Sequence, residues 1–250
     1  MRRIVFFLLA VISCSMLFGQ SGQLFNKGKQ DYRDQKFADA LNSWNQILEK
    51  GEHSTALYFN MGNAHYKLNQ VGLSIYYYEK ALQLDPTNAD VLNNLSYAQN
   101  ATVDEIEPLP RTLFQRWFDE LSGLMSLRGW SLLTLALAFI CGLMFVLYYF
   151  GTRERQKRLL FGGSLVSFGL TIFALVICFM IEARESKDSP AIIITERAKI
   201  QSEPNMGSEE SFILHEGTKV QILDQEGDWL RIQIADGKDG WLVDNTVKRL

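Results

Sequence analysis

Cysteine is scarce in this chain of 250 residues, which contains three. Cys14 lies in an apolar segment near the amino terminus, whereas Cys141 and Cys178 lie inside two long apolar runs. The polar parts of the chain therefore have no cysteine with which to form a disulfide. Cys141 and Cys178 differ in depth along their runs by roughly 15 Å, so they are interpreted as apolar filling residues and not as a bridge.

Features that catalysis requires are also lacking. The chain has three histidines, and His53, His65 and His215 show no metal-ligand spacing. No glycine-rich phosphate-binding loop is present, and no set of nucleophile and base can be recognised. We therefore predict that the protein is not an enzyme and has no cofactor and no metal site.

An excess of positive charge is absent. The chain has 25 Lys and Arg residues against 28 Asp and Glu residues, which gives a net charge of −3. A basic face, the electrostatic sign of a nucleic-acid-binding protein, does not stand out. The composition therefore predicts partners other than nucleic acid.

Two long segments lack charge altogether. Residues 130–150 and 159–181 contain no Asp, Glu, Lys, Arg, His or Pro. Each is long enough to span a hydrocarbon core, which needs about 20 helical residues. We predict two transmembrane helices, and the absence of charge within them gives no support to a transport pathway.

The segment between these runs, 151–158, is strongly basic. Arg153, Arg155, Lys157 and Arg158 outweigh the single Glu154. Short loops rich in Arg and Lys remain in the cytoplasm. The sequence therefore predicts a two-pass protein of the bacterial inner membrane, with both soluble parts on the periplasmic or external side.

The amino terminus agrees with export. Arg2 and Arg3 precede an apolar stretch that ends near Phe18, so residues 1–20 are predicted to be a signal peptide. The segment around Cys14 also resembles a lipobox, which would leave Cys14 as a lipidated first residue. Under both alternatives the chain after this segment is exported.

Residues 21–100 repeat themselves at a spacing of 34. Gly28 matches Gly62, and Trp44 matches Tyr78. This period marks stacked helix–turn–helix units, and residues 55–88 resemble the tetratricopeptide repeat almost throughout. A third unit begins at Ala89 but has no second helix, and such arrays need about three units to be stable alone. We therefore expect a partner or a neighbouring part of the chain to stabilise this domain.

Repeat proteins of this kind bind ligands on the concave face formed by the first helix of each unit. The sequence places six candidate partner-binding residues there: Phe25, Lys29, Tyr32, Phe59, Asn63 and Tyr66. Some of these aromatic side chains are alternatively interpreted as packing between helices. Asp90 on the same face would repel a ligand carboxylate.

An amphipathic helix is predicted within 111–128. Thr112 is a suitable N-cap, and apolar residues recur at helical spacing over Leu113–Met125. Trp117 and two phenylalanines stand just before the first apolar run. The segment is predicted to lie on the membrane surface, and the alternative is that it packs against the repeats.

Residues 190–250 change to a β-rich pattern of short strands with turns, which predicts a small closed barrel. The segments GTKVQIL, GDWLRI and DGKDGWL resemble the bacterial SH3 domain. Trp229 and Trp241 are candidate ligand contacts, although a tryptophan on a barrel strand is more often part of the core.

In this order, the signal, the tetratricopeptide repeats, the paired spans and the SH3-like barrel resemble the BatE type of protein of bacterial aerotolerance (Bat) operons. The resemblance implies a cell-envelope role in stress resistance. It also implies partners among membrane proteins with von Willebrand A domains and, indirectly, a MoxR-type ATPase. Two functions are expected from these modules: an assembly scaffold for protein partners, or a peptidoglycan tether in which the barrel binds the wall.

Overall fold

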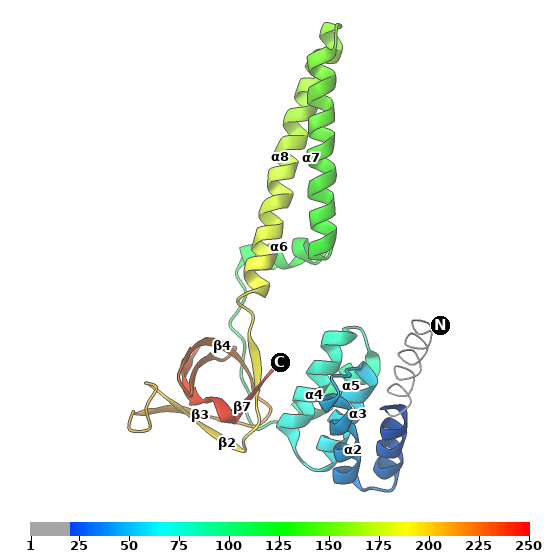
Figure 1. Ribbon diagram of the computed structural model, residues 1–250. Helices are drawn as coiled ribbons and strands as arrows, with labels where there is room; N and C mark the ends of the chain where they lie inside the picture. The colour runs from blue at the N-terminus through cyan, green and yellow to red at the C-terminus, as the bar shows by residue number, and fades with distance from the viewer. Residues whose placement is uncertain (1–20) are drawn as a thin grey trace, which may run out of the picture. The chain divides into compact units, whose positions relative to one another are not determined.

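The computed structural model describes residues 21–250, which divide into two compact units (Figure 1). One unit joins the chain up to Pro108 to Ser189–Leu250, and the other is Leu109–Asp188. The segment predicted to be a signal peptide, with Cys14, lies outside the described residues. The first unit contains the helical repeats and the β-rich region, and the second contains the long apolar helices.

The repeats form five consecutive helices. The first covers residues 21–33, and α2 (Phe37–Glu49), α3 (Thr55–Lys67), α4 (Val71–Leu84) and α5 (Ala89–Gln99) come after it. Local sequence explains where they begin and end. The side chains of Ser54 and Asn88 cap α3 and α5 by accepting from backbone N–H groups. Pro86 stands just after the end of α4, where it cannot continue the helix.

The period of 34 residues reflects close packing within each helix pair. A Cβ atom on Gly62 would lie 2.6 Å from the ring of Tyr78, so only glycine allows this approach of α3 and α4. The Ser74 hydroxyl on α4 donates to the Gly62 carbonyl at 2.9 Å. In the first unit, Trp44 packs against Gly28 in the same way.

The β-rich region is a single curled antiparallel sheet of seven strands (Figure 1). The strands are β1 (Pro190–Ile193), β2 (Arg197–Gln201), β3 (Glu210–His215), β4 (Lys219–Glu226), β5 (Trp229–Gln233), β6 (Asp239–Val243) and β7 (Val247–Arg249). Their order is β3-β2-β6-β5-β4-β1-β7. Alternate residues such as Leu230, Ile232 and Leu242 fill the inside of the sheet.

Strand β1 buries both of its faces. Ala191 and Ile193 belong to the core of the β-sheet, whereas Ile192 belongs to the core of the repeats. All three are fully buried. Leu250, at the carboxyl end of the chain, also packs against the repeat core. The barrel therefore covers apolar surface of the incomplete repeat array. That this contact supplies the stabilisation expected from a neighbouring part of the chain stays a prediction.

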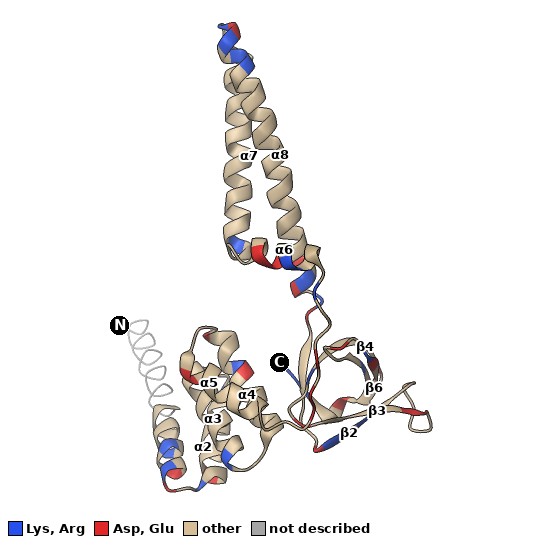
Figure 2. Ribbon diagram, turned by 180° about the vertical axis from the view of Figure 1, so that it is seen from behind, with Lys and Arg blue, Asp and Glu red and all other residues tan. Residues whose placement is uncertain are grey.

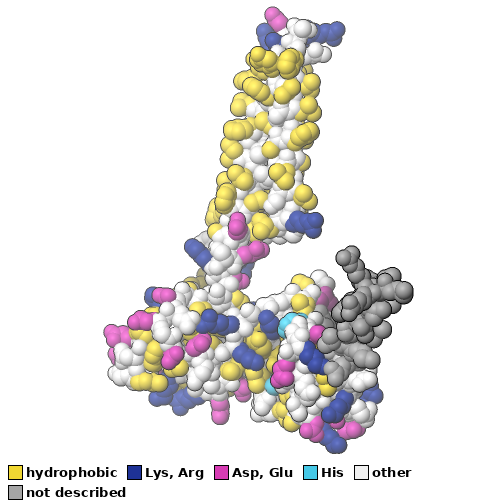
Figure 3. Space-filling model, in the orientation of Figure 1, with side chains coloured by type: hydrophobic (Ala, Val, Ile, Leu, Met, Phe, Trp, Pro, Cys, Tyr) yellow, Lys and Arg dark blue, Asp and Glu magenta, His cyan; other side chains and the backbone are white. Residues whose placement is uncertain are grey.

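The second unit contains α6 (Leu113–Ser122), α7 (Leu127–Phe150) and α8 (Glu154–Glu185). Both α7 and α8 are long and apolar enough to cross a membrane. Hydrophobic side chains cover the visible face of this pair along most of its length (Figure 3). The length and composition of the two helices are those of membrane spans.

The helices of this unit extend beyond the predicted spans. The first begins at Leu127 and the second at Glu154, so only Gly151, Thr152 and Arg153 form the connection between them. Small and polar side chains join the two helices. The Ser167 hydroxyl donates to the carbonyl of Leu137 at 2.8 Å. Cys141 and Cys178 are free thiols.

Candidate binding surfaces

A groove on the repeats is the first candidate site. It has a volume of about 390 Å³, which is in the range of ligand-binding pockets. Its lining comes from the first helix of the array and from α3, α4 and α5: Tyr32, Asn63, Tyr66, Lys67, Tyr78, Asn94 and Tyr97. The groove is thus built from polar-tipped aromatic rings, two amides and a single cation.

Asn63 is the centre of the hydrogen bonds in this groove. Its Oδ1 atom accepts from the Tyr78 hydroxyl at 2.6 Å and from Asn94 Nδ2 at 2.8 Å. These two bonds connect α3 to α4 and to α5 and fix the orientation of the Asn63 amide. Burial raises the pKa of Tyr78 to about 12, although hydrogen bonds from neighbouring side chains oppose the shift. The phenol is therefore a neutral donor throughout the physiological range.

The structure brings together three of the six residues expected on the concave face. Tyr32, Asn63 and Tyr66 line the groove. Phe25 and Phe59 are partly buried against the repeat core, as is Tyr32, and they do not line the groove. The Lys29 ammonium lies 5.9 Å from the centre of the Phe25 ring.

Four lining residues were missed from the sequence. Tyr97 and Asn94 lie on α5, the first helix of the incomplete third unit, and are not among the six candidates. Lys67 is the last residue of α3, and Tyr78 entered the sequence analysis only as the counterpart of Trp44 in the repeat. The spacing held a usable signal, because Asn63 and Tyr66 recur as Asn94 and Tyr97 after 31 residues.

The junction between the repeats and the barrel centres on Asp104. Its Oδ2 atom accepts from the backbone N–H of His215 at 2.7 Å and from the Thr218 hydroxyl at 2.6 Å. Its Oδ1 atom accepts from His215 Nδ1 at 2.7 Å. Burial raises the pKa of Asp104, but these hydrogen bonds and the charge of His215 outweigh burial and hold the pKa below its ordinary value.

Further contacts extend this junction along α4. The backbone N–H of Gly72, in the first turn of α4, donates to Glu216 at 3.0 Å. Lys219 pairs with Glu79 at 2.9 Å. The ammonium of Lys248 lies 4.8 Å from the centre of the Tyr76 ring, and burial lowers its pKa. The groove residues take no part in these contacts.

The barrel offers a second candidate surface. Leu230 and Leu242 point into the core, so their neighbours Trp229 and Trp241 point to the outer face and remain partly exposed. Arg231 is paired with Trp241 across the strands and forms an ion pair with Asp239 at 2.6 Å. The two tryptophans are therefore outside the barrel core, where a ligand has access to them.

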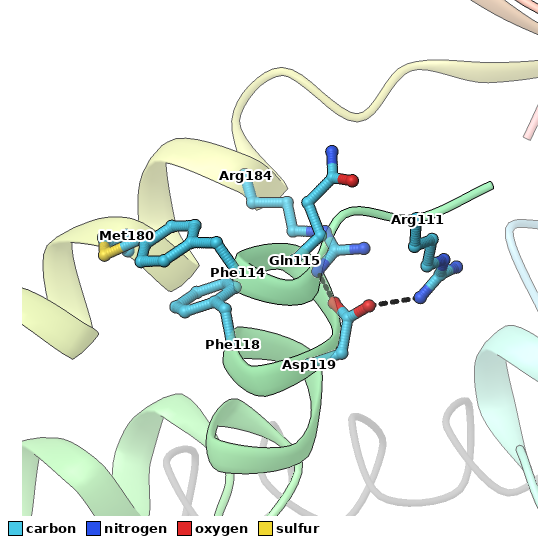
Figure 4. A pocket seen from close by; sticks show the side chains of 7 residues that line it. All are labelled: Arg111, Phe114, Gln115, Phe118, Asp119, Met180 and Arg184. Atoms are coloured by element: carbon cyan, nitrogen blue, oxygen red, sulfur yellow. Dashed lines mark hydrogen bonds and ion pairs between the residues drawn. The ribbon is translucent and has the colours of Figure 1, made fainter. Parts of the chain in front are cut away.

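A third candidate surface is formed by α6 and the end of α8. Figure 4 shows Asp119 between Arg111 and Arg184, with an ion pair to each. These contacts hold the pKa of Asp119 below its ordinary value, with Arg184 the largest cause. Phe118 is buried with Trp130, whereas other apolar side chains of this helix stay exposed: Leu113, Phe114 and Trp117.

The connection between α7 and α8 concentrates positive charge. Figure 2 shows Lys and Arg residues, in blue, at this end of the helix pair. Arg155, Lys157 and Arg158 lie in the first turns of α8, and Arg153 precedes them. Glu154 lies 3.9 Å from Arg158, with both side chains exposed. Within residues 21–250, no group of three or more His, Cys, Asp and Glu side chains is arranged to hold a metal ion.

Comparison with protein families agrees with the two modules of the first unit. A tetratricopeptide repeat family matches residues 55–88, and a second family of this repeat matches residues 77–103. The bacterial SH3 domain family matches residues 196–247. The chain thus contains a tetratricopeptide-type helical array and an antiparallel SH3-like region. Both kinds of module are typically binding modules without catalytic activity. No curated protein is detectably similar to the chain.

Two solved structures are similar to parts of the chain. One is the UNC-45 chaperone, described for binding and folding muscle myosin, with 17% identity and a TM-score of 0.32, covering 56% of this chain and 13% of that one. The other is the first TPR of Spaghetti (RPAP3) bound to an HSP90 peptide, with 16% identity and a TM-score of 0.21. This match covers 33% of the present chain and 93% of the solved one. Similarity at this level carries no functional argument.

Proposed function

We propose that this protein is a membrane-anchored scaffold of the bacterial cell envelope. The repeats bind protein partners in their groove, and the SH3-like barrel supplies a second binding surface. The groove lined by Tyr32, Asn63 and Tyr66 is the observation that carries this proposal, because it is accessible, polar at its centre and of ligand size. The resemblance to BatE-type proteins adds an aerotolerance or stress-related membrane complex as the setting.

The proposed topology rests on the charge at the helix connection. Cationic side chains at Arg153, Arg155, Lys157 and Arg158 keep this turn in the cytoplasm, so the first unit lies on the periplasmic or external side. Protease treatment of spheroplasts is expected to remove the barrel without detergent. A barrel that survives until detergent is added would contradict this orientation.

The helix α6 is proposed to lie in the membrane interface. Phe118 attaches it to the helices α7 and α8, and the ion pair of Asp119 with Arg184 attaches it to the end of α8. The exposed side chains of Phe114 and Trp117 then face lipid, as in other interfacial helices. Quenching of tryptophan fluorescence by brominated lipids tests this placement in a Trp130→Phe background. The quenched fraction should fall when Trp117 is also replaced by phenylalanine, because the other tryptophans, Trp44, Trp229 and Trp241, belong to the first unit.

Cross-linking in intact cells, followed by mass spectrometry, tests the scaffold function. The wild-type chain is expected to capture cell-envelope proteins, with membrane proteins that contain von Willebrand A domains among them. A chain with Asn63→Asp and Tyr66→Ala should lose the partners held by the groove. Capture of cytoplasmic proteins alone would contradict the proposal.

The alternative function is a peptidoglycan tether. It is favoured by the partly exposed Trp229 and Trp241 on the outer face of the barrel, because aromatic rings stack on sugar and peptide surfaces. Sedimentation of the full chain in detergent with purified sacculi separates the two functions. A tether would sediment with the sacculi and lose this binding on Trp241→Ala, whereas a scaffold for proteins would stay in the supernatant.

A further inference from the structure

The pocket between α6 and the end of α8 has a charged side and an apolar side. Its volume is about 360 Å³, which is in the range of pockets that hold small ligands. The lining comes from residues 111–119 and from the last turns of α8, so the pocket lies wholly within the second unit. Phe114, Phe118 and Met180 form the apolar side, and the charged groups lie away from them around Asp119 (Figure 4).

The apolar side lies closer to the membrane core than the charged side. Met180 belongs to the uncharged run of α8 that ends at Ile181, whereas Arg184 comes one turn later. Four helical residues correspond to a rise of about 6 Å. With α8 as a membrane span, the pocket thus passes from the depth of the hydrocarbon to that of the headgroups. A phospholipid has the same order, with acyl chains followed by a charged headgroup.

Three charged groups determine the electrostatics of the pocket. Arg111 and Arg184 each pair with one oxygen of the Asp119 carboxylate, which is 23% exposed. Each arginine uses only Nη1 in this pair, and a guanidinium carries five N–H donors. Among residues 21–250, the remaining donors of both guanidiniums have no acceptor. Two positive charges against one negative charge leave the lining with a net charge of +1.

Gln115 adds a neutral donor to the charged side. Its Oε1 atom accepts from the backbone N–H of Thr112 at 2.9 Å, as part of the capping box that begins α6. The Nε2 group of this amide has no acceptor within the described residues. Free donors from two guanidiniums and one amide match an anion with several oxygen atoms, such as a phosphodiester.

We propose that this pocket binds one anionic phospholipid. The phosphodiester lies on the guanidiniums of Arg111 and Arg184, and an acyl chain lies along Phe114 and Met180. The lipid thereby joins the start of α6 to the end of α8. This inference rests on the proposed placement of α6 in the membrane interface.

Both sides of the pocket restrict the ligand. Phe114 is 61% exposed, and a free phosphate ion would leave this apolar surface uncovered, whereas an acyl chain covers it. Both oxygens of Asp119 already accept from arginines, so the lining offers no free carboxylate to the ammonium group of a zwitterionic headgroup. Phosphatidylglycerol, with its single negative charge, complements the net charge of the lining.

The test uses the full chain in detergent micelles with phosphatidylglycerol and phosphatidylcholine in equal amounts. Native mass spectrometry counts the lipids that stay bound, and phosphatidylglycerol with a photoreactive acyl chain marks where they lie. We expect retained phosphatidylglycerol to exceed phosphatidylcholine several-fold, and the label to reach the peptides that contain Phe114 or Met180. Lipid at the basic connection of α7 and α8 is distinguished by its different labelled peptides. Excess glycerol phosphate, which lacks an acyl chain, should not displace the lipid.

Variants separate phosphate binding from a purely structural role of the arginines. Arg111→Gln and Arg184→Gln should each lower the labelling of the pocket about fivefold, because each removes a charged donor that is more than half exposed. Asp119→Asn removes the negative charge beside the phosphate, so the lipid should be held as tightly as in the wild-type chain or more tightly. Arg128→Gln, at an exposed arginine of α7 outside the pocket, is the matched control and should change nothing.

The outcomes separate this inference from the placement of α6 on which it rests. Loss of lipid in Asp119→Asn equal to that in the arginine variants would overturn the inference, since the arginines would then act only by holding α6. Equal retention of the two lipids, or displacement by glycerol phosphate, would overturn it as well. Quenching of Trp117 by brominated lipids without labelling of the pocket would remove the lipid site and leave the placement intact. Absence of both would overturn the two together.

Discussion

Replacing Asp104 with alanine is expected to loosen the barrel from the repeats without unfolding either of them. The carboxylate of Asp104 is 13% exposed and accepts three hydrogen bonds from the barrel, two from His215 and one from Thr218. Each donor loses its partner in the variant. The core of each module stays intact, because Asp104 belongs to neither.

The loss of stability at the junction in Asp104→Ala depends on the number of hydrogen bonds removed and on the fact that they share one acceptor. A hydrogen bond to a charged group contributes about 1.5–3 kcal/mol when it is counted alone. The three bonds to one carboxylate are not additive, and water replaces part of the loss at the His215 ring, whose side chain is 32% exposed. We expect the junction to be destabilised by about 3 kcal/mol, which corresponds to an increase of roughly a hundredfold in its opening constant.

Hydrogen exchange of the full chain in nanodiscs measures this opening. Amides of Gly72 and Gly217 are protected by bonds at or beside the junction, to Glu216 and to Ile193. Their exchange should accelerate in Asp104→Ala, whereas amides inside β5 and β6 should not change. Glu105→Ala, the exposed neighbour on the same segment, is the matched control. Equal exchange in the two variants would refute the role of Asp104.

The same carboxylate makes the junction sensitive to acid. The pKa of Asp104 is lower in the folded protein than the ordinary value of about 3.9. The stabilisation is therefore fully present above pH ~4 and is lost as the pH falls through the lowered pKa. Opening should increase there in the wild-type chain, and the variant Asp104→Asn should lack this acid-dependent step.

Two glycine substitutions probe the packing elsewhere. Gly62→Val should destabilise the repeats by about 2–3 kcal/mol, since the new side chain meets the buried Tyr78 ring. Thermal unfolding monitored by circular dichroism at 222 nm measures this loss of stability. An unchanged unfolding midpoint would contradict the close approach of α3 and α4. Gly217→Val combines a φ of +90° with a Cβ only 2.6 Å from Thr102, whereas Gly227→Val has a φ of +58° in open space. Exchange at the junction should therefore increase in the first variant alone.

Part of the candidate site could be predicted from the sequence, since helical periodicity places residues on a face. The period of 34 residues placed Tyr32, Asn63 and Tyr66 on the inner helices, where the groove lies. The period does not show which inner-face side chains are drawn into packing. Phe25 and Phe59 are partly buried against the core and do not line the groove. Tyr78 joined the groove because its hydroxyl reaches Asn63.

The sequence of β1 contains a sign that the barrel packs against the repeats, and this sign can be interpreted only with the structure. Strand β1 reads as an unbroken apolar run at Ala191, Ile192 and Ile193, and a half-buried strand would alternate. The run indicates a strand covered on both sides. It does not indicate what covers the second side, because hydrophobic burial has no direction and no partner preference.

Along this chain, local pattern determined the kinds of element: helical period and glycine spacing for the repeats, uncharged length for the two apolar helices, and alternation for the strands. These signals act between residues that are near in sequence, so they can be read without a fold. Only the tertiary structure decided that Asp104 meets His215, that Asn63 joins Tyr78 to Asn94, and that Trp229 and Trp241 face outward. Those outcomes depend on contacts between segments up to 111 positions apart, whose geometry is fixed by how whole modules pack.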